Sequence, residues 1–321
     1  MGDLGETNNV LSIVMATYNR CESLRHVLNG LLGQENASDI NYEIIVVDNN
    51  STDKTKEIIE SFKLGFDEKL EYFFEANQGK SFALNKGIAK SKGDIIAFID
   101  DDVLLDEGWI SSVVRSSKEY RWDAMGGRIL PRYPAGTPRW IKDNKDLLAG
   151  PIALYDYGED VKRYRGFMAP FAGANMAVKK TLFDEVGLFK TNLGPGRGTF
   201  SEDTELFERL KDAHKNLYYC GETLVWHPVD RKRMNLRYIA KWNIVHGRYY
   251  TMREMAEKGD DLVVHSKMLC YLIATNIFKV LRLILNIFNR RIFLVYWNGF
   301  FCQWGMLVEY WRSFERKRRR F

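Results

Sequence analysis

The first hundred residues alternate short apolar runs with stretches of helical periodicity, and this alternation constrains the fold more than any other feature. The apolar runs, rich in β-branched and aromatic residues, lie at 11–16, 42–47, 70–74 and 95–99. The helical stretches between them lie at about 22–32, 51–62 and 81–89. Repeated strand–helix units predict right-handed crossovers and a mostly parallel sheet with both faces covered. The sequence therefore predicts an α/β fold.

Three consecutive aspartates end the fourth of these runs. Asp100, Asp101 and Asp102 follow directly after residues 95–99. Adjacent carboxylates repel one another and resist burial unless a cation relieves them. Mg²⁺ and Mn²⁺ prefer oxygen ligands and commonly keep positions open for substrate phosphates. Because open α/β sheets bind ligands at the carboxyl ends of their strands, the triplet predicts a metal site. A solvated acidic loop would have the same composition.

Polar residues also follow the first two predicted strands. Thr17 and Tyr18 come after the first run, and Asp48 and Asn50 come after the second. In a parallel sheet these ends meet at the edge that carries the three aspartates, where a ligand can be held. An Asx turn or a helix cap would explain Asp48 equally well. Neither a G-x-G-x-x-G nor a P-loop motif occurs, so phosphate binding rests on the metal and on scattered cations.

Four other residues are candidates, each with a structural alternative. Lys80 precedes a predicted helix, where it could meet a phosphate or simply lie at a capped helix end. Glu202 and Asp203 begin a helix predicted at 201–210, after a glycine-rich loop at 194–198. The helix dipole explains one of these carboxylates and leaves the other for general-base catalysis. His227 follows an apolar run and suits a metal or diphosphate site, or a structural hydrogen bond.

The middle of the chain has little periodicity. Prolines, aromatics and glycines are scattered over 124–170, and we expect an irregular excursion that faces the substrate. Residues 171–178 predict a return strand, and 181–186 a short helix.

Taken together, these motifs resemble those of the inverting family 2 glycosyltransferases with the GT-A fold, of the membrane-associated bacterial type. The matching stretches are IVMATYNR at 13–20, IVVDNNSTDKT at 45–55, NQGKSFALN at 77–85, GDIIAFIDDDV at 93–103, GANMAV at 173–178 and SEDTEL at 201–206. Each is weak alone, but their order and spacing are specific. The resemblance implies a Rossmann-like, mostly parallel central sheet and a catalytic domain over 1–235.

The resemblance also implies roles for the candidate residues. Thr17, Tyr18, Asp48 and Asn50 would bind the nucleotide, most often uridine, and Asp100 or Asp101 would contact its ribose or a water. Asp102 would be the direct ligand of Mn²⁺ or Mg²⁺, with Asp100 beside it. Independently of the resemblance, Lys80 remains the candidate for the nucleotide's phosphates and His227 the further metal-site candidate. Asp203 would be the catalytic base and Glu202 its neighbour. The acceptor hydroxyl would attack the anomeric carbon from the face opposite the nucleoside diphosphate.

The expected function is therefore transfer of a sugar from a nucleotide-sugar, most often a UDP-sugar, to a lipid-linked or glycan acceptor, as in polysaccharide biosynthesis. The Q-x-x-R-W signature of processive synthases does not follow the acidic pair, which favours a single addition. One alternative is a nucleotidyltransferase of related fold, which would release pyrophosphate. Another is a catalytically inactive membrane-bound scaffold, against which the intact acidic motifs argue.

The C-terminal part has a different composition. Residues 231–321 hold 19 Lys and Arg against 6 Asp and Glu, whereas the rest holds 28 against 36. Apolar residues recur at helical spacing from Ile273 to Phe288, with Thr275, Asn276 and Lys279 on the other side. A basic amphipathic helix of this kind is typical of a membrane surface. We therefore expect a helical, membrane-associating region over 236–321.

Further features support that region. Residues 292–308 form a run of 17 residues without a formal charge. This length is the short limit for a membrane span. Trp297, Trp304 and Trp311 recur every seven residues, and Arg316–Arg320 close the chain. We expect peripheral or monotopic binding to anionic lipids at the cytoplasmic face of the cell membrane. A helical core extension or a dimer interface is the alternative, and a homo-oligomer is compatible with the sequence.

Other partners and compartments are disfavoured. We expect no nucleic-acid partner, because no reading motif accompanies the positive charge. The four cysteines are widely separated, which favours a reducing compartment. Residues 1–9 are polar and acidic, unlike a secretory signal.

Overall fold

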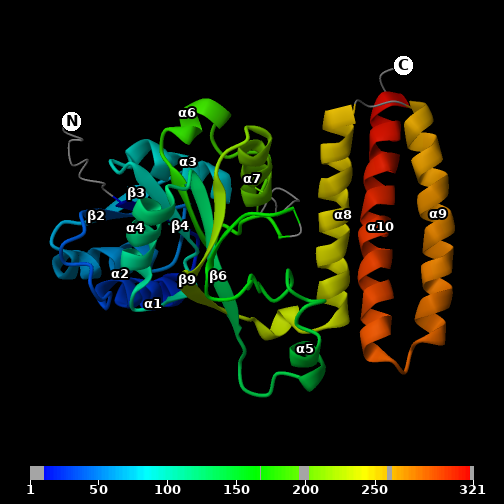
Figure 1. Cartoon of the computed structure of the whole chain (residues 1–321), viewed down its shortest axis with the longest axis horizontal. Helices are drawn as coiled ribbons and strands as arrows, with labels where there is room; N and C mark the ends of the chain where they lie inside the picture. Colours follow the sequence, from blue (N-terminus) through cyan, green and yellow to red (C-terminus); the bar gives the residue numbers. More distant parts are fainter. Residues whose placement is uncertain (1–10, 167, 195–201, 259–261, 319–321) are drawn as a thin grey trace. The chain divides into compact units, whose positions relative to one another are not determined.

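The computed structural model describes residues 11–166, 168–194, 202–258 and 262–318. These residues form two compact units (Figure 1). The first, the catalytic unit, contains the described residues within 1–132, 155–197 and 202–228. The second, the helical unit, contains those within 133–154 and 229–321. The helical unit thus includes a segment from the middle of the chain as well as the C-terminal helices.

The catalytic unit begins with the predicted strand–helix alternation. Its elements, in chain order, are β1 (Leu11–Thr17), α1 (Cys21–Leu32), β2 (Tyr42–Asp48), α2 (Thr55–Phe62), η1 (Lys63–Phe66), β3 (Leu70–Phe74), α3 (Lys80–Lys90), β4 (Ile95–Ile99), β5 (Leu104–Leu105), α4 (Trp109–Tyr120), β6 (Ala124–Arg132), β7 (Val161–Arg163), β8 (Asn175–Lys179), α6 (Leu182–Val186), α7 (Glu202–Asp212) and β9 (Leu217–Pro228). The four strands predicted from the first hundred residues are confirmed.

Nine strands form one sheet within the described residues, in the order β3-β2-β1-β4-β8-β6-β9-β5, with β7 paired to β9. The strands β3, β2, β1 and β4 are parallel, as predicted. The strand β8 is antiparallel to β4 and β6, and β6 is parallel to β9. Because β1 lies between β2 and β4, the ends of all three strands meet at one edge.

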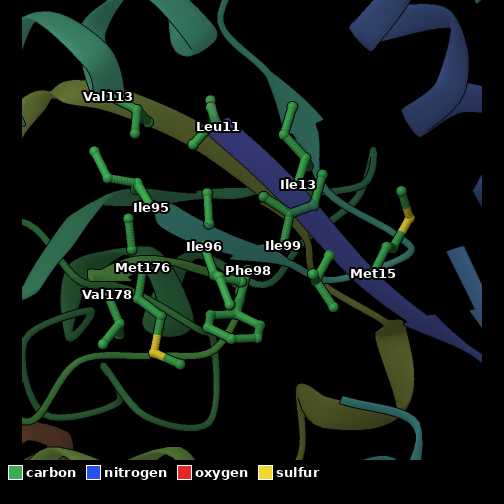
Figure 2. Close-up of a cluster of buried hydrophobic side chains, with 14 of the residues drawn as sticks. Leu11, Ile13, Met15, Ile95, Ile96, Phe98, Ile99, Val113, Met176 and Val178 are labelled. Atoms are coloured by element: carbon green, nitrogen blue, oxygen red, sulfur yellow. The ribbon is translucent and has the colours of Figure 1, made fainter. Parts of the chain in front are cut away.

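Apolar side chains of neighbouring strands build the core of this unit. Figure 2 shows Ile96 and Phe98 of β4 beside Met176 and Val178 of β8. The helix α3 presses closely on this sheet, because a Cβ placed on Gly87 would lie 2.4 Å from Cγ1 of Val14 in β1. A glycine is therefore required where α3 crosses β1.

Two expectations for the middle of the chain are wrong. Residues 124–132 are not irregular but form β6, a nine-residue strand. Its glycines lie against side chains, since a Cβ on Gly126 would be 2.6 Å from the Phe171 ring. The return strand begins at Asn175 rather than at 171, because the chain turns there and the Asn175 N–H donates to the Ala172 carbonyl.

The helical unit consists of α5 (Arg139–Asp143), η2 (Arg231–Arg233), α8 (Leu236–Lys258), α9 (Leu262–Leu285) and α10 (Arg290–Arg318). Within the unit, α10 lies between α8 and α9 (Figure 1). A second hydrophobic cluster joins Ile141 and Leu148 of the segment 133–154 to Ile239 of α8 and Leu294 of α10. This cluster fastens the segment to the end of the helices near the α9–α10 turn.

The helix α9 packs with its polar side inward. Thr275 and Lys279 bond to Gln303 of α10, and Asn276 is buried. The apolar side, from Ile273 to Phe288, is exposed. By length and composition, residues Met268–Leu285 could cross a membrane, with a mean hydropathy of 1.8. The predicted amphipathic helix is present, and its polar side faces a neighbouring helix rather than water.

Some sequence-based expectations fall outside the described residues. These are the polar N-terminal residues 1–9, the part of the glycine-rich loop at 195–198, Ser201 at the predicted helix start, and Arg319 and Arg320 at the C-terminus.

Candidate active site

The polar ends of β1, β2 and β4 lie at one edge of the sheet, as the sequence predicts. Thr17 of β1 is opposite Asp48 of β2 in the parallel register, and the aspartate triplet follows β4 on the other side of β1. Thr17 is buried, whereas Tyr18 and Asn50 are exposed. This edge therefore brings together the residues predicted to hold a nucleotide.

Asp48 has both of its carboxylate oxygens bonded within the protein. Oδ1 accepts a hydrogen bond from the Ser51 N–H at 2.8 Å, and Oδ2 accepts one from the Tyr72 hydroxyl at 3.1 Å. The first bond spans three residues, as in a helix cap, rather than the two of an Asx turn, and both were structural alternatives for Asp48. Burial, together with the Asp48 charge, raises the pKa of Tyr72 to about 12. Each carboxylate oxygen can accept two hydrogen bonds and accepts one here, so Asp48 can still accept a bond from a ligand.

The loops that follow β1 and β2 hold each other in place. The Asn19 N–H donates to Ser51 Oγ at 2.9 Å, and the Thr52 N–H donates to Asn19 Oδ1 at 2.7 Å. Asn49, buried after β2, accepts from the Gly79 N–H at 2.7 Å and donates to the Asn77 carbonyl at 2.7 Å. These bonds fix the loop just before Lys80 against the end of β2.

The three aspartates have two cationic partners. Lys80 Nζ is 2.6 Å from Asp100 Oδ1. Arg20 pairs with Asp101 at 3.2 Å and also bonds Asp102. Burial raises the pKa of Asp101 to about 6, although Arg20 opposes the shift. Burial alone would raise the pKa of Asp100 as well, but Lys80 beside it holds that pKa below its ordinary value.

His227, at the end of β9, completes a possible metal-binding group with two of the aspartates. One ligand atom each from Asp100, Asp102 and His227 lies within 4.8 Å of the others. The His227 Nδ1 is 3.0 Å from the Pro228 carbonyl, which can only accept, so Nδ1 carries a proton. In the neutral ring, Nε2 then presents its lone pair to Asp102 Oδ1 at 3.6 Å.

These donors fit a divalent cation. Asp102 Oδ1 is buried and accepts no hydrogen bond from any described residue. A buried carboxylate oxygen that faces an imidazole lone pair is unfavourable unless a cation or a proton lies between them. Two carboxylates and an imidazole suit Mn²⁺, and they leave coordination positions for substrate oxygens.

The predicted acidic pair begins α7 and lies beside Lys80. Glu202 Oε1 is 3.6 Å from Lys80 Nζ, and Asp203 Oδ2 accepts a hydrogen bond from the Gly173 N–H at 2.9 Å. Burial, strengthened by the charge of Asp203, raises the pKa of Glu202 to about 7. Burial also raises the pKa of Asp203, against its hydrogen bonds. A carboxylate with a raised pKa is suited to accept a proton from a hydroxyl.

The structure adds residues that the sequence did not single out. Arg20 follows β1 and meets the aspartates after β4, which only the strand order reveals. Arg209, seven residues after Glu202, bonds Glu205 of α7 at 2.8 Å and the Gly187 carbonyl at 2.8 Å. It thereby ties the helix that carries the acidic pair to the loop after α6. Helical spacing within α7 predicts the Arg209–Glu205 pair, but nothing local predicts the carbonyl contact.

The chain is similar in sequence to several known proteins. The chain is 28% identical over 222 residues to the glycosyltransferase AglE of Haloferax volcanii, covering 68% of this chain and 66% of AglE. It is 24% identical over 253 residues to the succinoglycan biosynthesis protein ExoM of Rhizobium meliloti, covering 78% of this chain and 77% of ExoM. It is 29% identical over 192 residues to a glucosyl-dolichyl phosphate glucuronosyltransferase of Haloferax volcanii, covering 57% of each chain.

A similar fold is found among solved structures. The mannosyltransferase PcManGT of Pyrobaculum calidifontis, in complex with GDP-Man and Mn²⁺, matches with a TM-score of 0.56 at 19% identity, covering 78% of this chain and 64% of that one. This likeness shows the fold, which is of the GT-A type, as predicted. The sequence model of glycosyl transferase family 2 matches residues 12–187, more than half of the chain. This protein therefore belongs to glycosyl transferase family 2.

Proposed function

We propose that this protein is a metal-dependent, inverting glycosyltransferase that moves a single sugar from a UDP-sugar to a lipid-linked or glycan acceptor. Family membership supports sugar transfer itself. The metal, the stereochemistry and the nucleotide are the proposed parts. The domain that carries the chemistry would be residues 1–235, with 236–321 holding it at the cytoplasmic face of the membrane.

The observation that carries the proposal is the position of Lys80. Its ammonium group is 2.6 Å from Asp100 and 3.6 Å from Glu202. It therefore links the aspartate triplet after β4 with the acidic pair of α7, although about a hundred residues separate them in the chain. A donor diphosphate at the first group would have its sugar near the second, as a single-displacement reaction requires.

The residues suggest a division of labour. Thr17, Tyr18, Asp48 and Asn50 would hold the nucleoside, with Asp101 and Lys80 near its ribose and phosphates. Asp102, Asp100 and His227 would hold Mn²⁺ or Mg²⁺. A divalent cation bound there would neutralise the charge that develops on the leaving diphosphate. Arg20, paired with Asp101 and Asp102, would adjust its contacts when these ligands bind.

Asp203 would act as the general base. Its raised pKa and its hydrogen bond from the Gly173 N–H give a carboxylate that is basic and fixed in orientation. It would take the proton of the acceptor hydroxyl while that oxygen forms its bond to the anomeric carbon. The bond from this carbon to the diphosphate oxygen would break, the nucleoside diphosphate would leave, and the sugar would be joined to the acceptor with inverted configuration. Glu202 would keep Lys80 in place beside the base.

The relatives guide the choice of donor and acceptor without fixing either. One relative is named as acting on glucosyl-dolichyl phosphate, and another belongs to succinoglycan biosynthesis. These names support a lipid-linked or polysaccharide acceptor here. The similar PcManGT structure holds GDP-Man, so a UDP-sugar has to be tested against a GDP-sugar.

The test is product analysis with the full chain in detergent. The protein is incubated with UDP-sugars and with GDP-mannose, each with Mn²⁺, with Mg²⁺ or with a chelator, and the released nucleotide is identified. Metal-dependent release of UDP supports the proposal. A parallel incubation with a nucleoside triphosphate and a sugar 1-phosphate tests the alternative. Release of pyrophosphate there would identify a nucleotidyltransferase, and no turnover in any incubation would favour an inactive scaffold.

A further inference from the structure

The outer side of α9 is a continuous apolar surface that no described residue covers. It is formed by the exposed side chains Tyr271, Ile273, Ile277, Phe278, Leu281 and Ile284, and it continues through Leu285, Ile287 and Phe288 at the turn into α10. We call these nine residues the outer face of α9. Ile277, Leu281 and Ile284 are 61%, 56% and 65% exposed, whereas Leu272 on the opposite side is buried. A surface of this size on one helix requires a partner.

The inner side of α9 is polar, and its contacts indicate whether the helix is stabilised in water or in lipid. It presents Thr275 and Lys279 to Gln303 of α10, with Asn276 buried between the helices. Both side-chain polar atoms of Asn276 lack a hydrogen-bond partner among the described residues. Polar contacts inside and apolar groups outside are the reverse of a helix stabilised in water, and they are the arrangement found in lipid.

The contact between α8 and α10 has the same character. A Cβ on Gly247 of α8 would lie 1.9 Å from the Cys302 carbonyl, and one on Gly305 of α10 would lie 2.0 Å from the Ile244 carbonyl. The two backbones therefore touch at reciprocal glycines. Close backbone contact at small residues is a common way for helices to associate where the hydrophobic effect between them is weak.

Charge decides between lipid and a second copy of the chain. Residues 262–308 contain five Lys and Arg and no Asp or Glu. Arg282 lies over the ring of Phe278 in the outer face of α9, and Arg290 and Arg291 begin α10 just after the turn. Two copies joined through this face would bring like charges together, whereas an anionic lipid surface would attract all of them. The outer face of α9 is thus complementary to an anionic bilayer.

The contacts at the α9–α10 turn restrict how the unit meets the bilayer. Arg291 pairs with Asp146 at 2.5 Å, the Arg290 guanidinium lies 5.5 Å from the Trp140 ring centre, and the Asn298 amide donates to the Leu147 carbonyl at 2.7 Å. These partners belong to the segment 133–154, which is part of the same helical unit. The turn therefore lies on the same side of the membrane as this segment.

The composition of α8 excludes an arrangement in which the other end of the bundle, away from the α9–α10 turn, passes through the membrane. This helix carries seven Lys, Arg and Glu residues between Leu236 and Lys258, and it packs along α10. Moving the other end of the bundle through hydrocarbon would bury those charges, at several kcal/mol each. The helices must therefore lie along the membrane rather than cross it.

We propose that α9 is an in-plane membrane anchor: its outer face inserts into the interface of an anionic bilayer along its whole length, and none of the described helices spans the membrane. This inference deepens the proposed membrane location by naming the surface, its lipid partner and its orientation. It does not depend on the donor or on the reaction.

The test combines binding to vesicles with insertion depth, using the full chain. The variant Ile277→Gln/Leu281→Gln/Ile284→Gln removes apolar contact in the middle of the outer face. Burial of three such side chains predicts a loss of at least about 100-fold in partitioning to phosphatidylcholine–phosphatidylglycerol vesicles. Leu64→Gln is the matched control, because Leu64 is 94% exposed on the catalytic unit, and it should bind like the unaltered chain. Arg282→Gln should lose about 5-fold on these vesicles and little on phosphatidylcholine alone.

Depth distinguishes the in-plane from the spanning arrangement. Cysteines are introduced one at a time at Ile273, Ile277 and Ile284, in a background in which Cys21, Cys270 and Cys302 are replaced by Ser and only the buried Cys220 is kept. Each is labelled with an environment-sensitive dye and quenched by lipids brominated at different depths. Equal, shallow depths are expected for all three, and a gradient from one surface towards the other would refute the in-plane anchor.

Two further outcomes would also overturn the inference. One is full vesicle binding by the triple glutamine variant. The other is a dimer in the absence of lipid that this variant dissolves, which would assign the surface to a second copy. Metal-dependent donor hydrolysis in detergent is measured in parallel. Its absence from every variant would count against the proposed reaction and leave the membrane inference standing.

Discussion

Replacing Lys80 with Met tests whether one cation joins the two acidic groups. In the folded chain, Lys80 Nζ is 2.6 Å from Asp100 and 3.6 Å from Glu202. At an effective dielectric constant of about 20, these separations correspond to attractions of about 6 and 5 kcal/mol before desolvation. Removing one member of a buried ion pair typically costs about 3–5 kcal/mol. Since the Lys80 and Asp100 side chains are 21% and 24% exposed, we expect a loss nearer 2–3 kcal/mol in unfolding free energy.

The dependence of this loss on pH follows from the sign of the Asp100 shift. Lys80 keeps the pKa of Asp100 below its ordinary value, against the effect of burial. A lowered pKa contributes stability above the unfolded pKa, and this contribution is lost as the pH falls through the folded pKa. The penalty of Lys80→Met should therefore be largest near about pH 8 and smaller near about pH 5, where the uncompensated carboxylates of the variant can take up protons.

Urea unfolding at about pH 8 and at about pH 5 measures the loss in unfolding free energy and its change with pH. Lys179→Met is the matched control, because Lys179 pairs with Asp123 at 3.0 Å but its side chain is 41% exposed. An exposed pair of this kind contributes about 0–1 kcal/mol. The reasoning is refuted if the two variants lose the same stability, or if the loss in Lys80→Met does not change with pH.

Four further predictions follow from the same geometry. Asp203→Asn should lower turnover by at least about 10²-fold and leave donor binding in calorimetry intact; unchanged turnover would remove Asp203 as the base. The rate of the unaltered enzyme should fall as the pH drops below about 7, because burial raises the pKa of Glu202 to about 7 and also raises that of Asp203; a profile flat down to about pH 5 would contradict this. His227→Ala should raise the Mn²⁺ concentration needed for half-maximal activity by about 10-fold or more, and an unchanged metal titration would exclude it as a ligand. Gly87→Ala should cost about 1–3 kcal/mol in thermal unfolding, since its Cβ would lie 2.4 Å from Val14, whereas Gly173→Ala, with its nearest contacts at 3.6 Å, should cost much less.

The sequence predicts the part of the site that is formed by the ends of the parallel strands, because the repeated strand–helix pattern is visible in the first hundred residues. Short β-branched runs separated by helices give a parallel sheet, and parallel strands bring their carboxyl ends to one edge. Thr17, Asp48 and Asp100–Asp102 could therefore be placed together without coordinates. The residue type of His227 suits a metal site, a diphosphate site or a structural hydrogen bond, and in the structure its Nε2 is 3.6 Å from Asp102 Oδ1.

The remaining features depend on contacts that no local pattern encodes. Arg20 meets Asp101 only because β4 pairs with β1. The strand β6 lacks a clear apolar pattern because it contains Gly126 and Gly127, which leave room for the side chains of Phe171 and Asn175. Periodicity correctly divides α9 into two faces. It cannot tell which face has a protein partner, because Gln303 of α10 supplies polar contacts that a single helix does not predict.

The balance of charge in the site explains why its parts should bind ligands together. Among the described residues, Asp100, Asp101, Asp102, Glu202 and Asp203 face only two cationic side chains, Lys80 and Arg20. A nucleotide diphosphate adds further negative charge, so it would be repelled from this edge of the sheet unless a divalent cation came with it. Conversely, a cation held by Asp102, Asp100 and His227 gains oxygen ligands from the diphosphate. Each ligand therefore increases the affinity for the other by the same factor.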